Sequence, residues 1–514
     1  MALRTAVQLT GDNLTIDDVW AVAVDRAPAA LNDEARDKIV RARELVERAA
    51  HGTGEHTYGI NTGFGRFVSH SIPEELAAEL QIRLLRSHAC GVGEPYPDEV
   101  VRAAMLLRAN TLAKGFSGAR PQTVELLVEC LNRGVLPHVP SRGSVGASGD
   151  LAPLAHLALP LVGEGEAWVD GTRMAGAVAL EAAGLEPIVL EAKEGLSLVN
   201  GTQFMAAFGS LALARARWLA KTADVACAMS VEALLGSRTS FLPQIHASRP
   251  LPGQIDSAAN VLQLLEDSAI IESHRWCDKV QDAYSLRCAP QVHGASRDLL
   301  AYGEATVSVE LNAATDNPLV LVDDELLVSN GNFHGQPLAF ALDTLAMAVS
   351  ELANISERRV ERLVNPSLSE GLPPFLTVDG GLNSGFMIPQ YVAAALVSEN
   401  KALCHPASVD SIPTSAGQED HVSMGNAAGL KAWQVLANAE RVLAIELLAG
   451  AQAIEFLAPL EPGIGARAAR DAVRALSPRV SDDRSLSGDI ETVAAAIRDG
   501  SYITAVEAET GELR

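Results

Sequence analysis

Residues 143–150 read GSVGASGD and combine three glycines with two serines and an alanine ahead of an apolar run. Glycine is used where the backbone must bend or approach another group more closely than a side chain permits. If a tight bend presses the amide nitrogen of Gly149 against the carbonyl carbon of Ala147, the main chain can cyclise with loss of water. Loss of a second water, from Ser148, leaves an exocyclic methylene. The stretch therefore has the composition needed to make an electrophile from the chain itself.

The same residues have two simpler interpretations. In the G-x-S-x-G turn of serine hydrolases a strand leads into the serine, but here Asp150 replaces the last glycine and we expect no strand before the turn. A serine hydrolase is therefore disfavoured. A glycine-rich turn in which Asp150 caps a helix beginning at Leu151 remains open.

Other glycine-rich or polar clusters interrupt the chain, and irregular segments on a helical scaffold are where function is usually found. They lie at 57–65, 200–203, 281–288, 329–335 and 413–421. Side chains in them have structural alternatives to chemistry: Tyr58 as a packed aromatic, Arg287 as an ion-pair partner, Asn200 as a turn residue or helix cap, and Glu419 within a solvated charged turn.

The elements that must position these clusters are mainly helices. Residues 203–235 are apolar nearly all round, as in a helix inside a bundle, and residues 430–456 repeat this pattern. Within 337–352 the apolar residues alternate spacings of four and three, which is typical of a helix-packing seam. The members of that seam are Leu338, Leu342, Leu345, Val349 and Leu352. The sequence thus predicts a mainly α fold built on long core helices.

Shorter elements surround this core. Asn32 caps a predicted helix that Gly52 ends, and Ser71 with Glu74 has capping-box spacing ahead of a second helix. Strand signals are few: the first dozen residues suggest a short strand pair, and two hairpins are predicted around Asp170-Gly171 and Asp323-Asp324.

No linker or long charged block divides the 514 residues, so we expect one unit spanning 1–514. It would have a lobe at 1–200 that carries the 143–150 stretch and a helical-bundle lobe at 201–514.

Composition excludes several classes of protein. The formal net charge of −24 disfavours a nucleic-acid partner. The N-terminus lacks a signal-peptide layout, and no uninterrupted apolar run reaches the roughly 18 residues of a membrane span. The six scattered cysteines favour a reduced, cytoplasmic protein. Because the paired Cys/His spacings, the P-loop and the G-x-G-x-x-G motif are all missing from the sequence, we expect no metal and no nucleotide cofactor.

Residues 143–156, GSVGASGDLAPLAH, resemble the signature of the aromatic amino acid ammonia-lyases. The electrophile of that family is a 4-methylidene-imidazol-5-one made from Ala-Ser-Gly. Further segments resemble family blocks in family order, so that the resemblance covers almost the whole chain. These segments are YGINTGFG (58–65), NGTQ (200–203), QDAYSLRC (281–288), GNFH (331–334) and TSAGQEDHVSMG (414–425).

The resemblance implies an ammonia-lyase/fumarase-like fold and a task for each cluster. Ala147, Ser148 and Gly149 would form the ring, whose methylene carbon would accept the substrate amine. Asn200 would hydrogen-bond the ring, and Phe333 would pack near it.

Further roles carried over from the family concern proton transfer and substrate binding. Tyr58 would remove a β-proton, and Tyr284 would assist proton movements or ring formation. Free tyrosine has a pKa of about 10, so a tyrosine that acts as a base at neutral pH needs its phenolate stabilised. The resemblance implies that helix N-termini point at the site and that their positive ends supply this stabilisation. Arg287 would clamp the substrate carboxylate through its planar fork, and Gln281 would line the pocket.

Within the family, RSHACGVGEP (86–95) and QEDHVSMG (418–425) most resemble the histidine ammonia-lyases, or histidases. His88 and Glu419, with Gln418 beside it, would bind the substrate ring. An imidazole can donate and accept hydrogen bonds, whereas a benzene ring would leave these groups unpaired. Two departures, Ala283 where proline is common and Gly417 where asparagine is common, would alter loop rigidity.

The resemblance therefore implies conversion of L-histidine to trans-urocanate and ammonia in the cytoplasm. It also implies a homotetramer with shared active sites, in which Tyr58 and Tyr284 of one site come from different chains. Two alternatives stay open: a phenylalanine or tyrosine lyase or aminomutase of the same family, and a catalytically inactive helical scaffold that binds partners.

Overall fold

Helices dominate the computed structural model, which describes residues 5–51, 59–60, 62–63, 65–67, 69–147 and 149–514. Tyr58 and Ser148 of the predicted site lie outside these residues. The mainly α fold predicted from the apolar runs is confirmed. All members of the seam predicted within 337–352 are buried.

The chain divides into two compact units. The first comprises Met1–Leu211, Glu304–Asp343 and Pro406–Leu430, and the second comprises Ala212–Gly303, Thr344–His405 and Lys431–Arg514. The long helices contribute residues to both units; they are α9 (Gln203–Ala233), α14 (Ala289–Glu310), α15 (Gln336–Val364) and α17 (Gly425–Glu455). The predicted lobes on either side of residue 200 stay a prediction.

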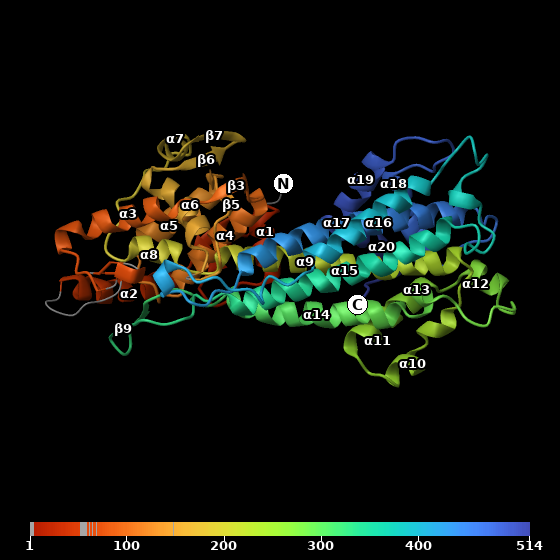
Figure 1. Ribbon diagram of the computed structural model, residues 1–514, viewed down its shortest axis with the longest axis horizontal. Helices are drawn as coiled ribbons and strands as arrows, with labels where there is room; N and C mark the ends of the chain where they lie inside the picture. Colours follow the sequence, from red (N-terminus) through yellow and green to blue (C-terminus); the bar gives the residue numbers. More distant parts are fainter. Residues whose placement is uncertain (1–4, 52–58, 61, 64, 68, 148) are drawn as a thin grey trace. The chain divides into compact units, whose positions relative to one another are not determined.

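The first unit holds the shorter helices of the N-terminal half and the small sheets. The helices are α1 (Ile16–Ala23), α2 (Asp33–His51), α3 (Ala77–His88), α4 (Asp98–Ala113), α5 (Pro121–Asn132), α6 (Leu151–Ala158), α7 (Gly176–Ala182) and α8 (Glu194–Val199). The strands are β1 (Val7–Leu9), β2 (Ala29–Leu31), β3 (Val92–Pro95), β4 (Leu136–Pro137), β5 (Pro140–Arg142), β6 (Glu166–Val169), β7 (Thr172–Ala175), β8 (Leu319–Leu321) and β9 (Leu326–Val328). Figure 1 shows β6, β7 and α7 together at one edge of this unit.

Both predicted hairpins are confirmed, as β6–β7 and β8–β9. The turn between β6 and β7 places Asp170 at φ 47° and Gly171 at φ 74°, the left-handed conformations of a two-residue hairpin turn.

Two local predictions were wrong. Of the first dozen residues the structure describes those from Thr5 onward; this part supplies one strand, β1, which pairs in parallel with β2 rather than within the segment. The second helix begins at Ala77 after a 3₁₀ turn at Glu74–Leu76, and its N-cap residue, Leu76, makes no side-chain cap. Capping-box spacing at Ser71 therefore did not mark the start of the helix.

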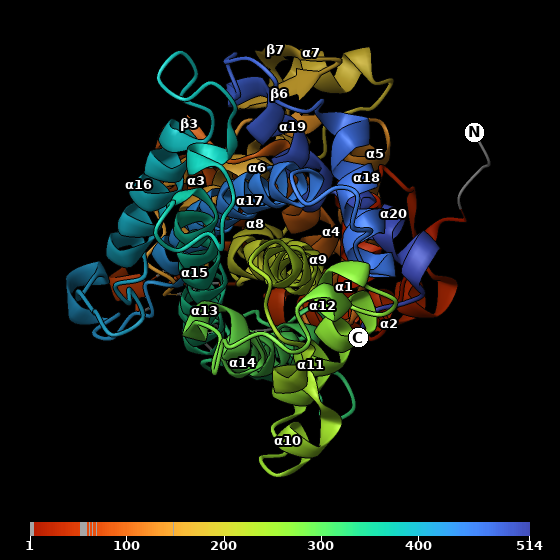
Figure 2. The same cartoon turned by 90° about the vertical axis from the view of Figure 1, so that its right-hand side faces the viewer.

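The second unit is a helical bundle. Besides its parts of the long helices, it contains α10 (Pro243–Ala247), α11 (Pro252–Leu264), α12 (Ala269–Ser273), α13 (Tyr284–Arg287), α16 (Met387–Leu403), α18 (Ile464–Leu476), α19 (Ser487–Arg498) and α20 (Ser501–Thr510). Within this unit α14, α15 and α17 surround α9 (Figure 2). The buried pair of Arg215 on α9 and Glu440 on α17, at 2.7 Å, is one contact between them.

A chain of buried charges joins all four long helices inside the second unit. Asp224 on α9 accepts from His293 on α14 at 2.7 Å, and His293 Nε2 lies 3.3 Å from Nη1 of Arg359 on α15. Arg359 pairs through two nitrogens with Glu446 on α17, at 2.5 and 2.8 Å. Although burial opposes ionisation, Arg297 and His293 lower the pKa of Asp224 to about 2. The bundle core is therefore held by paired charges as well as by apolar packing.

The cysteines of the chain are all unpaired. All six lie in the described part of the chain, and none forms a disulfide. Among the described residues no cluster of His, Cys, Asp and Glu could hold a metal ion. One helix, α15, is long and apolar enough to cross a membrane, but 72% of its apolar window is buried, as in a core helix.

Arg359→Met is expected to lower the free energy of unfolding by about 3–5 kcal/mol, because it leaves the Glu446 carboxylate buried without its cation. Arg441→Met is the control: Arg441 pairs with Glu491 at a partly exposed site, and we expect a loss of at most about 1 kcal/mol. Urea unfolding followed by circular dichroism measures both. Equal losses in the two variants would contradict this account of the core.

Candidate active site

The 143–150 turn closes against the start of α9. The amide of Asp150 donates to the carbonyl of Gly201 at 2.6 Å, and Gly149 and Gly201 form a parallel bridge. Gly149 has φ +75°, and a Cβ on it would lie 1.8 Å from the carbonyl oxygen of Gly201. Only glycine fits at position 149, as a backbone pressed against another backbone requires.

Asp150 connects this turn to α9. Its carboxylate accepts from the amides of Phe204 and Met205, at 2.9 and 3.1 Å, and from the hydroxyl of Ser144 at 2.9 Å. The prediction that Asp150 caps the helix at Leu151 is right for its position but wrong for its side chain, which makes no cap there. Burial raises the pKa of Asp150 to about 6 against these hydrogen bonds.

A second expectation about the turn is corrected by β5, a short strand that directly precedes it. The hydrolase interpretation stays disfavoured, because Asp150 rather than glycine follows Gly149.

Two other predicted clusters meet the turn through backbone hydrogen bonds. The amide of Met424 donates to Val145 O at 2.9 Å, and the hydroxyl of Ser423 donates to Gly146 O at 3.1 Å. The amide of Gly335 also donates to Gly146 O, at 3.3 Å. The segments 331–335 and 421–425 are therefore brought to the turn, and half-buried Phe333 comes with the first of them.

Asn200 stands at the C-terminal end of α8, next to Gly201. Its carbonyl accepts from Nη1 of Arg108 at 2.6 Å. Its side-chain oxygen is buried and has no hydrogen-bond partner among the described residues. A buried acceptor without a partner costs free energy, so the amide of Asn200 is placed to bind a group beside the turn.

His88 is the last residue of α3, and the hydrogen bonds around it define which ring nitrogen carries the proton. The Ser87 hydroxyl lies 3.0 Å from the carbonyl of Leu84 and 2.9 Å from Nδ1 of His88. A hydroxyl has one hydrogen and a carbonyl can only accept, so Ser87 donates to Leu84 and accepts from His88 Nδ1. Nδ1 therefore carries the proton, and Nε2 of the neutral ring is an acceptor.

The surroundings of His88 favour this neutral form. Burial lowers its pKa, while the Leu84 carbonyl and the negative charge of Glu419 act in the opposite direction. His88 and Glu419 therefore lie within electrostatic reach of each other, and their binding of one substrate ring stays a prediction.

The loop that carries Glu419 is unusual in its backbone. Ser415, Ala416 and Gly417 have φ of 51°, 54° and 84°, and such left-handed conformations are strained in non-glycine residues. The loop is closed by hydrogen bonds between Thr414 and Glu419, including Thr414 Oγ1 to the Glu419 carboxylate at 2.6 Å. Gln418 is exposed beside it. This strained stretch directly precedes Gln418 and Glu419, two of the residues predicted to bind the substrate ring.

The remaining predicted residues lie together in the second unit. Nη2 of Arg287 donates to the side chain of Gln281 at 3.0 Å, and its guanidinium carbon lies 4.7 Å from the centre of the Tyr284 ring. Tyr284 is 72% exposed. Gln281 and Arg287 line a pocket of about 660 Å³, whose other cationic side chains are Arg238, Arg275 and Lys279. Glu272 and Asp282 also line the pocket, and Arg275 and Lys279 pair with acidic side chains. The planar guanidinium of Arg287 is the group suited to bind a carboxylate here.

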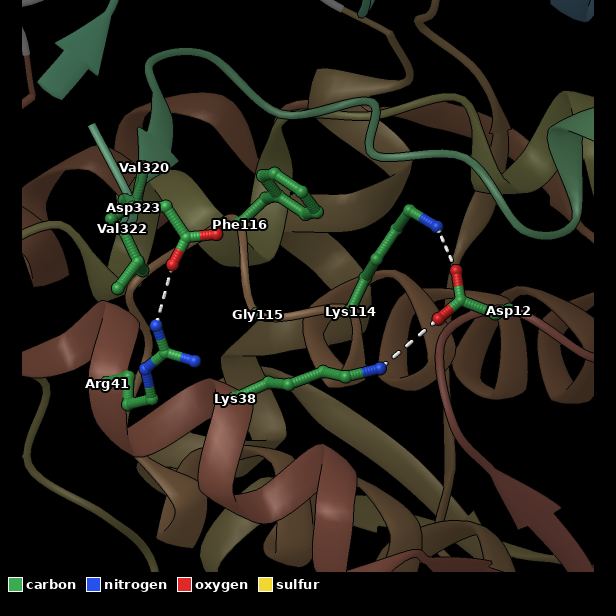
Figure 3. Close-up of a pocket in the computed structure, with 9 residues that line it drawn as sticks. All are labelled: Asp12, Lys38, Arg41, Lys114, Gly115, Phe116, Val320, Val322 and Asp323. Atoms are coloured by element: carbon green, nitrogen blue, oxygen red, sulfur yellow. Dashed lines mark hydrogen bonds and ion pairs between the residues drawn. The ribbon is translucent and has the colours of Figure 1, made fainter. Parts of the chain in front are cut away.

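Another pocket, of about 240 Å³, lies in the first unit between α2, the end of α4 and β8 (Figure 3). Its three cations all take part in ion pairs: Lys38 and Lys114 contact Asp12, and Arg41 contacts Asp323 at 2.7 Å. These pairs fasten the N-terminal segment and the β8–β9 hairpin to α2, which is a structural task.

Residues 14–475 match the family described as aromatic amino acid lyase. The chain belongs to the aromatic amino acid lyase family.

Individual lyases and aminomutases resemble it over nearly their whole length. It is 58% identical over 505 residues, 98% of each chain, to the histidine ammonia-lyase of Gloeobacter violaceus. The crystal structure of histidine ammonia-lyase from Trypanosoma cruzi is 46% identical, with a TM-score of 0.91, and the match covers 98% of this chain and 96% of that one. A tyrosine aminomutase from Streptomyces globisporus is 39% identical, with a TM-score of 0.94, over 99% and 100% of the two chains.

For an aromatic amino acid lyase, the described residues fit a ring group made from the chain. Gly149 leaves no room for a Cβ, Ala147 is buried, and the amide oxygen of Asn200 is buried beside the turn without a partner among the described residues.

Sequence reasoning did not single out several buried charged residues around α8. Arg108, which holds Asn200, and the buried pair of Lys193 and Asp316, at 2.8 Å, were not singled out. A signal was present for Arg108, since a lone charge in the apolar run AAMLLRANTLA must find a partner inside the protein.

Asp150→Asn is expected to flatten the pH dependence of stability between about pH 4 and pH 6. Native Asp150 keeps its proton up to a pKa of about 6, whereas the unfolded chain releases it near 3.8. The native state thus binds more protons in this window, and the free energy of unfolding falls as the pH rises through it, by up to about 3 kcal/mol.

Asparagine can still accept from the amides of Phe204 and Met205, so the cap of α9 is retained. Urea unfolding of both proteins across this pH range makes the comparison. Parallel pH profiles for wild type and variant would rule out Asp150 as the titrating group.

Proposed function

We propose that the chain catalyses elimination of ammonia from L-histidine to give trans-urocanate. The structural observation that carries the proposal is that the His88 ring lies within electrostatic reach of the Glu419 carboxylate. It is supported by curated relatives named histidine ammonia-lyase at 50–58% identity over nearly the full length.

A 4-methylidene-imidazol-5-one formed from Ala147, Ser148 and Gly149 would supply the electrophilic carbon that captures the substrate amine. The side chain of Asn200 would hold this group in place. Tyr58 would take the β-proton, and Tyr284 would assist proton transfer. Arg287 would bind the substrate carboxylate, with Gln281 beside it, and Phe333 would cover the ring group.

The substrate ring would be recognised by hydrogen bonds. An imidazole N–H can donate to His88 Nε2, and the Glu419 carboxylate can accept from the ring or from the amine. Phenylalanine has no donor on its ring, so binding it would desolvate both groups without replacing their hydrogen bonds to water. Polar pockets reject apolar analogues for this reason.

We further infer a homotetramer with shared sites. The turn that carries Ala147 and Gly149 belongs to the first unit, whereas Gln281, Tyr284 and Arg287 belong to the second. The resemblance to the aromatic amino acid ammonia-lyases supports a site that residues of a second copy of the chain complete.

A cytoplasmic role in histidine degradation follows from this reaction and from six cysteines without a disulfide. The competing activity, a tyrosine aminomutase or lyase, has support in the TM-score of 0.94 to the Streptomyces enzyme. Fold similarity does not distinguish a histidine lyase from a tyrosine aminomutase or lyase, because individual side chains on a shared scaffold bind the substrate ring.

Purified protein is expected to release urocanate from L-histidine, which ultraviolet absorbance detects, and Ser148→Ala is expected to lose at least about 10³-fold of this rate because the methylene carbon cannot form. Intact mass provides the control: the wild-type chain should be lighter than its translated sequence by two waters. Product from tyrosine or phenylalanine with none from histidine would reverse the substrate assignment.

His88→Leu is expected to raise KM for L-histidine by about 10- to 100-fold, as for loss of one hydrogen bond that leaves a polar partner unpaired. The preference over phenylalanine should fall by a similar factor. Ser87→Ala is the matched control, and it should raise KM less, because the hydrogen bond between the Leu84 carbonyl and the His88 ring remains. Unchanged KM and unchanged preference in His88→Leu would show that His88 does not contact the substrate ring.

A further inference from the structure

Arg108 is a fully buried cation in the middle of α4. Its Nη1 donates to the carbonyl of Asn200 at 2.6 Å and to the side-chain oxygen of Gln203 at 3.0 Å. Its Nε and Nη2 are buried without a partner among the described residues. Burying a guanidinium with two groups unpaired is costly, so the contact with Asn200 needs an explanation beyond helix packing.

The guanidinium contacts the backbone segment that abuts the turn. A Cβ on Gly201 would lie 2.4 Å from Arg108 Nη1, and a Cβ on Gly149 would lie 1.8 Å from Gly201 O. Arg108 thus contacts the Asn200–Gly201 backbone, and this backbone contacts Gly149. Neither contact leaves space for an additional side chain. Displacement of the guanidinium would allow the Asn200–Gly201 backbone to move away from Gly149.

The charge of Arg108 persists at neutral pH. Burial lowers its pKa to about 10, and the negative charge of Asp316 opposes this. Asp316 is itself paired with Lys193 at 2.8 Å. A hydrogen bond from a charged donor is stronger than a neutral one, so Arg108 holds the Asn200 carbonyl more firmly than a neutral side chain could.

We propose that Arg108 is a positioning residue for formation of the ring group: it fixes the Asn200–Gly201 backbone where that backbone abuts Gly149 and so favours closure of the ring between Ala147 and Gly149. The inference rests on the proposed function, because it assumes that the ring forms. It assigns Arg108 to maturation of the protein and not to the turnover of substrate.

The covalent step needs no partner outside the chain. Gly149 N bonds to the carbonyl carbon of Ala147, and the first water carries away the Ala147 oxygen with the amide hydrogens of Ser148 and Gly149. The second water carries the Ser148 hydroxyl and its α-hydrogen. Because both losses are dehydrations, no oxidant or reductant is required, and bringing nitrogen and carbon together is the task left to the protein.

The test compares Arg108→Met and Arg108→Lys with Arg102→Met. Arg102 is the matched control because it is a buried arginine on the same helix whose guanidinium binds the carbonyls of Val22, Ala23 and Leu131, away from the turn. Intact mass gives the fraction of chains that have lost two waters, and urea unfolding gives stability. Turnover per ring-bearing chain is measured separately.

Ring formation in Arg108→Met is expected to be slowed at least about tenfold. Arg108→Lys, which keeps the charge but not the fork, should lie between it and wild type. Arg102→Met should form the ring normally even if it is less stable, and turnover per ring-bearing chain should be unchanged throughout.

Complete ring formation at the wild-type rate in Arg108→Met would overturn the proposal. If Arg108→Met does not fold, the same result in folded Arg108→Lys overturns it. A deficit in Arg102→Met equal to that in the Arg108 variants would also overturn it, because the effect would then follow stability alone. A wild-type chain without the loss of two waters would instead refute the proposed function.

Discussion

The contact between Gly149 and Gly201 is the constraint on which the site depends. Two stretches of main chain approach so closely that the amide of Asp150 reaches Gly201 O at 2.6 Å and neither glycine can carry a side chain. The 143–150 turn, the end of α8 and the start of α9 are thereby fixed to one another. Asn200 takes its place beside the turn as a result, and the segments 331–335 and 421–425 are hydrogen-bonded to the same turn.

The scaffold supports this contact with buried polar groups. Asp150 satisfies free amides at the start of α9, and the Asn200 carbonyl is held from behind by Arg108. Both groups are fully buried, where a hydrogen bond is strong and an unpaired group is costly. The site thus takes its rigidity from the core, while the strained 415–417 loop supplies the more exposed side that carries Glu419.

Much of the fold could be predicted because it follows from the local spacing of apolar and turn-forming residues. The long helices α9, α15 and α17 and both hairpins follow from residue spacing alone. Pairing between distant segments could not be predicted: β1 finds its partner at β2, and nothing in the first dozen residues specifies this. Side-chain partners were missed for the same reason. Asp150 has the sequence position of a cap for α6, but its carboxylate caps α9, which is adjacent only after folding.

The described site residues that were named from the sequence fall into two groups, one in each compact unit. Ala147, Gly149, Asn200, Phe333, His88 and Glu419 lie in the first unit, and Gln281, Tyr284 and Arg287 gather in the second. Their roles came from family resemblance, which transfers chemistry but not the groups behind it. Arg108 and the hydroxyl of Ser87 became visible only through distances.

Within the described part of the chain, every contact of the 143–150 turn named above comes from residues of its own unit. Gly201, Phe204, Gly335, Ser423 and Met424 all belong to that unit. The described part of the turn is therefore held by contacts inside one compact unit, so that its position follows from the folding of that unit.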